Sequence, residues 1–294
     1  MGRHMETRKD NRKVLAEDPF IFYPQPPDWR WLSFAEAAEG VETWRASLSG
    51  LAAGARVGIA GSPSGAALVA DIAVRASGLV AVPLADSEIE MSDSGCVDCI
   101  LDLEAYELRT FPVPPATAGT ANGASPQRPA SSWSNGGCVV WRGAARDCAP
   151  VLLRRERLES AVERMGRDIG VLRERPIVVH GRSLGDAGER VVVEWAIHEA
   201  AAIVIAAPGT EMSVAGWVRP TLLQGSPAEL GEWIRSCTAE RHGKLVLERR
   251  FRRLAAVVVL ADETVDEETS RQWQEVGVRV VNAPTLGSAG DDRL

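Results

Sequence analysis

The sequence has 294 residues, of which 45% are hydrophobic and 25% charged, proportions that are typical of a globular protein with one large core or two ordinary ones. Its formal net charge of −7 argues against non-specific nucleic-acid binding, and its apolar runs are too short to span a bilayer. We therefore expect a cytoplasmic protein without a nucleic-acid or membrane partner.

The N-terminus and the cysteines agree with this expectation. Residues 1–18 are interpreted as a tag and tail, because they begin with MGRHM, which is typical of an expression tag, and carry no signal-peptide pattern. The five cysteines are an odd number, which favours reduced thiols. Cys96 and Cys99 form a CxxC, but no second pair at metal-binding spacing accompanies them. We therefore interpret them as small buried side chains and predict no metal site.

Residues 19–111 are predicted to form a first α/β sub-domain. It begins with an extended, aromatic and proline-rich segment, in which Trp29 and Trp31 are candidates for packing on another chain. Ser33 then caps a helix that runs to about residue 48, and Glu36 completes a capping box. The inward stripe of this helix is expected to contain Ala37, Val41, Trp44, Ala46 and Leu48.

The rest of this sub-domain alternates strands with a helix. RVGIAG, LVAVPL and CILDL are continuous apolar runs that are typical of buried strands. A helix is predicted between the first two of them, from Pro63 to about Ser77, with proline in its first turn. Buried strands that are joined through a helix indicate a parallel sheet covered on both faces.

Residues 112–136 are predicted to be a flexible linker or loop, because they are rich in Pro, Ala, Gly, Ser and Thr and lack hydrophobic periodicity. A second α/β sub-domain is predicted over residues 137–294. Its expected strands are CVVW, PIVVH, AIVIAA, LAAVVVLA and GVRVVNAP, with helices between them. The predicted fold class is α/β, with two doubly wound, mainly parallel sheets in two sub-domains.

This order of elements resembles the large N-terminal domain of the adenylate-forming superfamily, which contains acyl-CoA synthetases, aryl-CoA ligases, luciferases and nonribosomal-peptide adenylation domains. The stretch from Leu32 to Leu84 is similar to the family's opening, in which a helix precedes two strands. The resemblance covers nearly all of this chain but only the front part of a family member. It implies a truncated relative without the ribose-binding Asp and the catalytic Lys that the family carries further along.

A second stretch, RGAARDCAPVLLRRERL, matches the frame of the family's phosphate loop, S-G-T-T-G-x-P-K-G-V, without a gap. Arg142 stands at the Ser, Gly143 at the first Gly and Arg146 at the second, while alanines replace both Thr and the Lys. Such a loop needs glycines for close backbone approach, hydroxyl donors and a mobile positive charge. The resemblance therefore implies a degenerate nucleotide site, with Arg142, Gly143 and Arg146 as the remaining candidate contacts.

Two later stretches also resemble the family. His180, in IVVHGRSLGD, falls where many members carry an aromatic residue or His beside the substrate, so that His180 and Gly181 are candidate substrate-pocket residues. VVNAPTLG lies where the family has N-x-Y-G-x-T-E, a motif that contacts adenine and holds magnesium. Asn282 keeps the motif's Asn and is a candidate nucleotide contact, whereas Ser288 replaces its Glu. The resemblance thus leaves no acidic metal ligand in this register.

The residues also allow a different interpretation. GRSLG is a G-x-S-x-G pattern between a predicted strand and a predicted helix, as in the nucleophile elbow of α/β-hydrolases, with Ser183 as the nucleophile. Chain order argues against it, because His198 lies within a helical pattern and His242 precedes Asp262, the best acidic candidate. A serine hydrolase stays an alternative beside an ordinary glycine-rich turn.

We therefore expect a catalytically inactive, truncated relative of acyl- and aryl-CoA synthetases, with no catalytic residue and no cofactor, that acts as a protein partner, scaffold or homodimer. One alternative is a small-molecule binding protein that holds an acyl, aryl or nucleotide group in a crevice of the sheets. Another is a divergent adenylating enzyme that a second chain completes in trans.

Overall fold

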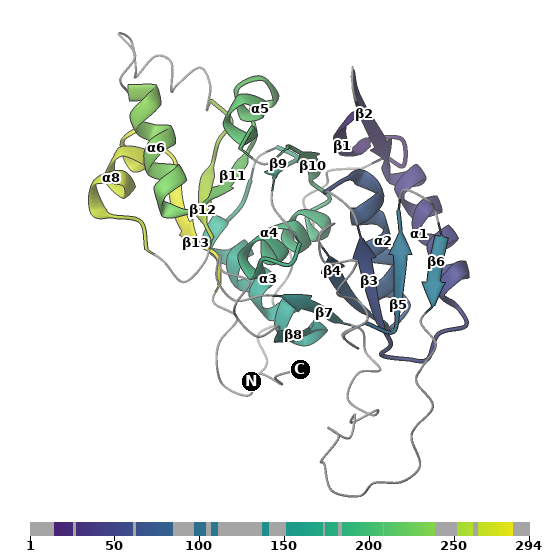
Figure 1. Ribbon diagram of the computed structural model, residues 1–294. Helices are drawn as coiled ribbons and strands as arrows, with labels where there is room; N and C mark the ends of the chain where they lie inside the picture. The colour runs from purple at the N-terminus through teal and green to yellow at the C-terminus, as the bar shows by residue number, and fades with distance from the viewer. Residues whose placement is uncertain are drawn as a thin grey trace, which may run out of the picture.

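The computed structural model describes residues 15–25, 28–60, 63–84, 97–103, 107–110, 137–140, 151–172, 174–181, 184–207, 209–238, 252–260 and 264–284. In these ranges the chain forms two mixed, mainly parallel sheets together with the helices that cover them (Figure 1). The predicted fold class is therefore confirmed. None of the described helices is long and apolar enough to cross a membrane.

The larger sheet has seven strands in the order β13-β12-β11-β9-β10-β1-β2. Its paired neighbours are parallel, except that β1 and β2 form an antiparallel hairpin at one edge. The strands are β1 (Pro19–Gln25), β2 (Asp28–Ser33), β9 (Ile177–His180), β10 (Ala202–Ile205), β11 (Leu222–Gly225), β12 (Ala256–Val259) and β13 (Arg279–Asn282).

The smaller sheet has six strands in the order β6-β5-β3-β4-β7-β8. β5, β3, β4 and β7 run parallel, and the edge strands β6 and β8 pair antiparallel with their neighbours. The strands are β3 (Arg56–Ala60), β4 (Val80–Leu84), β5 (Cys99–Asp102), β6 (Glu107–Thr110), β7 (Gly137–Val140) and β8 (Val151–Arg154).

The two sheets exchange strands across the boundary that the sequence interpretation set. β1 and β2 come from the first predicted sub-domain but join the larger sheet, where Ile21 is in register with Ile203. β7 and β8 come from the second predicted sub-domain but join the smaller sheet, where Cys138 is in register with Ala81. The assignment of one sheet to residues 19–111 and one to residues 137–294 is therefore corrected. A continuous apolar run predicts a buried strand, but it does not specify which neighbour that strand pairs with.

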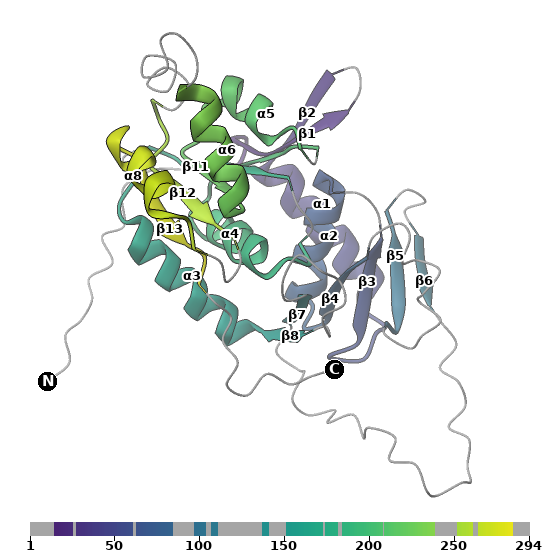
Figure 2. The ribbon, with the colours of Figure 1, turned by 60° about the vertical axis from the view of Figure 1, so that its left-hand side comes forward.

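The helices form a layer between the sheets and a second layer outside the larger sheet (Figure 2). Buried residues of α1, α2, α3 and α4 share one core cluster with strands of both sheets. Those of α5, α6 and α8 pack on the other face of the larger sheet. The helices are α1 (Phe34–Leu48), α2 (Gly65–Ala76), α3 (Arg155–Ile169), α4 (Ala187–His198), α5 (Glu211–Val218), α6 (Pro227–Thr238) and α8 (Glu267–Glu275).

Helix α1 begins with the predicted capping box. Ser33 Oγ accepts a hydrogen bond from the backbone N–H of Glu36 at 3.1 Å, and Glu36 Oε2 accepts one from the backbone N–H of Ser33 at 2.8 Å. The predicted inward stripe is correct for the buried Trp44 and Leu48, but Ala46 is exposed. Ala46 lies two positions from each of these residues, or about 200° around the helix, and so faces away from the core.

Candidate functional site

The carboxyl edge of the larger sheet is the candidate functional site. β9 ends at His180, β11 at Gly225 and β13 at Asn282. Because these strands are parallel, their carboxyl ends lie along one edge of the sheet. Open α/β sheets bind their ligands in crevices beyond this edge.

His180 belongs to a buried polar cluster at this edge. Its ring nitrogen Nδ1 contacts Oε1 of Glu189, in the first turn of α4, and Gln224 Nε2 on β11 donates to the same oxygen at 2.6 Å. His180 is 2% exposed, Glu189 0% and Gln224 4%. The neighbouring strand and helix therefore fix the orientation of the imidazole ring.

Two oxygen atoms of this cluster have no hydrogen-bond partner among the described residues: Glu189 Oε2 and Gln224 Oε1. A buried acceptor without a partner costs about 1–3 kcal/mol, so a donor that reaches either atom would stabilise the cluster. A water molecule or an N–H or O–H group of a ligand has this chemistry.

Side chains from α5 and α6 cover the two glycines at this edge. A Cβ atom on Gly181 would lie 2.3 Å from Oε1 and 2.6 Å from Cγ of Glu211. A Cβ atom on Gly225 would lie 3.1 Å from the ring of Trp233. The protein's own side chains therefore occupy the space over both backbones that a closely approaching ligand would need.

Asn282 lies apart from His180 and Gly181. β11 and β12 separate its strand from β9, which places the two strand ends three strand spacings, or roughly 14 Å, apart. Asn282 is exposed, and Ala283 and Pro284, which follow it, are buried. The structure therefore brings His180 and Gly181 together with Glu189 and Gln224, neither of which the sequence interpretation singled out, but not with Asn282.

The predicted phosphate loop connects two paired strands of the smaller sheet. Val140, at the end of β7, is opposite Val151, at the start of β8, so residues 141–150 join neighbouring strand ends. Arg142, Gly143 and Arg146 belong to this connection and lie outside the described residues, as does Ser183 of the G-x-S-x-G pattern. The roles of these residues stay predictions.

The described thiols are buried and are not joined in disulfides. Cys99, Cys138 and Cys237 form no disulfide, and Cys96 of the CxxC lies outside the described residues. Burial is the main cause that raises the pKa of the Cys99 and Cys138 thiols to about 11, so both are protonated near neutral pH. Among the described residues, no group of three or more His, Cys, Asp or Glu side chains could hold a metal ion.

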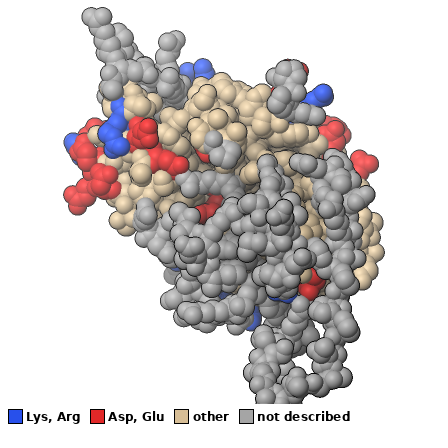
Figure 3. Space-filling model, viewed as in Figure 1, with Lys and Arg blue, Asp and Glu red and all other residues tan. Residues whose placement is uncertain are grey.

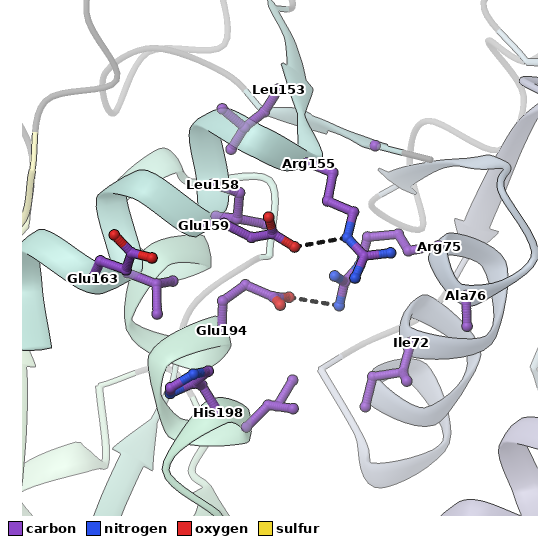
Figure 4. Close-up of a pocket in the computed structure, with 13 residues that line it drawn as sticks. Ile72, Arg75, Ala76, Leu153, Arg155, Leu158, Glu159, Glu163, Glu194 and His198 are labelled. Atoms are coloured by element: carbon purple, nitrogen blue, oxygen red, sulfur yellow. Dashed lines mark hydrogen bonds and ion pairs between the residues drawn. The ribbon is translucent and has the colours of Figure 1, made fainter. Parts of the chain in front are cut away.

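A cavity of about 450 Å³ lies at the other end of α4 (Figure 4). α2, α3, α4 and the start of the β7–β8 hairpin line it, and its apolar wall includes Ile72, Leu158 and Val162. Two ion pairs stand in this cavity: Arg75 Nη2 lies 2.5 Å from Glu194 Oε1, and Arg155 Nε lies 2.8 Å from Glu159 Oε1. The lining of this cavity is therefore mainly apolar, and the charged side chains of Arg75, Glu194, Arg155 and Glu159 in it are paired with each other. The only signal for it in the sequence is the position of Arg75 and Glu194 on the inward faces of apolar helices.

The surface charge agrees with the acidic composition of the chain. On the face drawn in Figure 3, Asp and Glu side chains gather over α8, whose exposed acidic residues are Glu267, Glu268 and Glu275. The described Lys and Arg side chains on that face occupy separate places. The described residues of this face form no broad basic patch of the kind that attracts phosphate backbones.

No protein-family model and no curated protein matches this sequence. Solved structures do match it. The nonribosomal peptide synthetase FmoA3 in its AMPPNP-bound form has a TM-score of 0.67 and 14% identity, over 90% of this chain and 29% of that chain. The anthranilate CoA ligase AuaEII in complex with anthranoyl-AMP has a TM-score of 0.65 and 14% identity, over 96% of this chain and 61% of that chain.

A third match is a long-chain-fatty-acid-CoA ligase, FadD1 from Archaeoglobus fulgidus, with a TM-score of 0.63 and 13% identity, over 90% of this chain and 60% of that chain. These enzymes are of the kinds that the sequence resembles. Because the sequence identities are only 13–14%, the similarity to these structures shows a shared fold and nothing more specific. The chain spans less than two thirds of the length of each of the three.

Proposed function

Because the chain has the fold of the N-terminal domain of adenylate-forming enzymes, we propose that it is a catalytically inactive relative of them that works through a protein partner. The observation that carries this proposal is the composition of the β7–β8 connection. Residues 141–150 contain one glycine and no Ser, Thr or Lys. They stand where the resemblance puts the phosphate loop.

The chemistry of adenylation explains why this composition matters. A carboxylate oxygen attacks the α-phosphorus of ATP, an oxygen–phosphorus bond forms, and the bond to pyrophosphate breaks. Charge builds up on phosphate oxygens, so the rate depends on placed hydrogen-bond donors and positive charges. Arg142 and Arg146 supply charge, but their side chains hinder the close approach of backbone N–H groups that glycines permit.

The carboxyl edge of the larger sheet supports the same proposal. Glu211 occupies the space over Gly181, and a second carboxylate, Glu189, is buried beside His180. On this proposal both carboxylates disfavour an anionic ligand at this edge, where the resemblance puts the substrate pocket. In addition, the residues that follow β13 carry no acid where the resemblance puts a magnesium ligand, since Ser288 stands there.

A second candidate function is small-molecule binding at this edge. Glu189 Oε2 and Gln224 Oε1, which have no hydrogen-bond partner among the described residues, favour it, because each can accept a hydrogen bond from an amino or hydroxyl group. On this account the group that binds is a hydrogen-bond donor rather than a phosphate. Binding without turnover therefore agrees with the loss of adenylation.

Pyrophosphate exchange tests the proposal. The folded chain is incubated with MgATP, labelled pyrophosphate and a panel of acyl and aryl carboxylates, and label entering ATP is measured. The anthranilate CoA ligase AuaEII with anthranilate serves as the active control. We expect no exchange by this chain with any carboxylate. Exchange above the no-carboxylate background would overturn the assignment as inactive.

A further inference from the structure

We propose that β2 pairs antiparallel with β2 of a second copy of this chain, with Trp29 at the two-fold axis of the resulting dimer. This inference rests on the proposed function, because it names the partner and the surface through which the chain works. It uses three features of the β1–β2 hairpin: an open strand edge, exposed indole rings and a charge pattern that is complementary to itself.

The first feature is the open edge of the larger sheet. β2 is the last strand in the sheet order, and among the described residues it pairs only with β1. An edge strand presents backbone N–H and C=O groups that another extended strand can bind. Figure 1 shows the β1–β2 hairpin at the end of the sheet, away from α6 and α8.

The second feature is a cluster of exposed indoles, formed by Trp29, Trp31 and Trp217. Their exposed fractions are 37%, 48% and 55%. The rings of Trp29 and Trp217 meet edge to face with 5.0 Å between their centroids, so β2 and α5 present one aromatic surface. Trp31 lies on the same face of β2 as Trp29, because side chains alternate along a strand. Exposed aromatic clusters of this kind are enriched in protein interfaces.

The third feature is the charge pattern of the strand. Asp28 and Arg30 flank Trp29, both are exposed, and neither has an ion-pair partner among the described residues. In a two-fold antiparallel pair centred on Trp29, Asp28 of each copy lies directly opposite Arg30 of the other copy. Directly opposite residues in an antiparallel pair interact, and opposite charges there are stabilising. The dimer would therefore gain two symmetric ion pairs.

The other two-fold registers lack this complementarity. Centring the pair on Arg30 places two Arg30 side chains opposite each other, and like charges in that position are destabilising. Centring it on Trp31 places Arg30 opposite Leu32. Only the register centred on Trp29 matches both charges, and it also brings the two Trp29 rings together on the aromatic face. The sequence of β2 therefore favours a second copy over an unrelated strand.

Sedimentation velocity over a concentration series tests the proposal. We expect the native chain to be a dimer that dissociates on dilution. Asp28→Arg and Arg30→Asp each put like charges opposite one another in both symmetric pairs, so each variant should raise the dimer dissociation constant by at least about tenfold. Both side chains are exposed, so thermal unfolding of each variant should match that of the native chain at a concentration low enough for the native chain to be monomeric.

Charge exchange supplies the decisive control. In an equimolar mixture of the two single variants, one chain carries arginine at both positions and the other carries aspartate at both. Opposite charges therefore face each other in both symmetric pairs, and a heterodimer should form. The double variant Asp28→Arg, Arg30→Asp should dimerise like the native chain.

Several outcomes would overturn the proposal. A native chain that stays monomeric at its highest soluble concentration would do so, as would a dimer that neither single variant weakens or a mixture that fails to associate. A monomeric chain that instead binds an extended peptide along β2 would also overturn it.

This test and the test of inactivity are independent. Sedimentation is measured without nucleotide or carboxylate, and pyrophosphate exchange does not report association. A chain that is monomeric and inactive would overturn the dimer proposal alone. A chain that is dimeric and exchanges pyrophosphate would overturn the proposed inactivity alone.

Discussion

Arg190 and Asp71 form a buried ion pair that joins the helices of the two sheets. Arg190 Nη1, on α4, lies 2.6 Å from Asp71 Oδ2, on α2, and both side chains are 0% exposed. Arg75 Nε also donates to Asp71 Oδ2 at 2.8 Å, and Arg75 contacts Glu194 in turn. The four charges cancel, which lets the network lie between the two sheets. It fixes α2 against α4 and hence one sheet against the other.

Replacing Asp71 should therefore destabilise the fold strongly. Asp71→Asn keeps the size of the side chain but leaves Arg190 buried without its counter-charge, and such a loss costs about 3–5 kcal/mol. Chemical denaturation measures the free energy of unfolding. The matched control is Glu42→Gln, which breaks the exposed Arg45–Glu42 pair and should change stability little. Equal losses in the two variants would contradict this account of the network.

The lowered pKa of Asp71 should make the free energy of unfolding depend on pH. Burial raises the pKa of the Asp71 carboxyl, but the charges of Arg190 and Arg75 lower it by more, so it lies below its ordinary value. A group with a lowered pKa stabilises the folded state fully above its unfolded pKa, about 3.9 for Asp, and loses this contribution as the pH falls through the folded pKa. The difference in unfolding free energy between the native chain and Asp71→Asn should shrink below about pH 4. A difference that stays constant down to pH 2 would argue against it.

The capping box of α1 predicts a smaller and more local effect. Ser33→Ala removes the acceptor for the backbone N–H of Glu36, and loss of an N-cap side chain costs about 1 kcal/mol. The control is Ser49→Ala at the other end of the helix, where an exposed hydroxyl donates to the carbonyl of Ala46. Thermal unfolding should show a lower midpoint for Ser33→Ala than for Ser49→Ala. The capping interpretation fails if both variants melt together.

The cluster at the carboxyl edge should be sensitive to the loss of its shared acceptor. Glu189→Ala leaves His180 Nδ1 and Gln224 Nε2 without the oxygen that both contact, at a cost of about 1–3 kcal/mol for each orphaned group. Glu189→Gln keeps an oxygen in that position and should lose less. Denaturation of the two variants side by side measures the difference. Equal stability of the two variants would show that the acceptor oxygen of Glu189 does not stabilise the cluster.

Local signals in the sequence predicted much of the fold. Ser33 and Glu36 lie three residues apart, and a capping box depends only on that spacing. The continuous apolar runs correctly predicted β3, β4, β5, β7, β9, β10, β12 and β13. Most residues of β3, β4, β9, β10 and β12 are buried, and strands buried on both faces need no polar alternation. Helix α5 was not predicted: it has only eight residues, contains Gly216, and its N-cap residue Thr210 makes no side-chain capping hydrogen bond. β6, with the sequence ELRT, is short and polar and lies at a sheet edge.

Non-local relationships could not be predicted. The pairing of β1 with β10 joins residues far apart in the chain, and no pattern within either strand specifies it. At the candidate site, the resemblance identified His180, but Gln224 and Glu189 are 35 residues apart in the chain and meet only through the fold. The available signal was weak: Gln224 is a polar residue at the end of an apolar run, Glu189 lies near the start of a helix, and buried polar groups need partners.

The central claim is that the nucleotide site has lost its chemistry, and titration calorimetry with ATP and magnesium, followed by AMP, tests it most directly. The chain is shown to be folded by circular dichroism in the same buffer. Our account predicts no heat of binding for either nucleotide, because the β7–β8 connection has a single glycine and none of the Ser, Thr or Lys residues that such a loop needs. Binding of either nucleotide at micromolar strength would contradict it and would show that Arg142 and Arg146 rebuild an anion site.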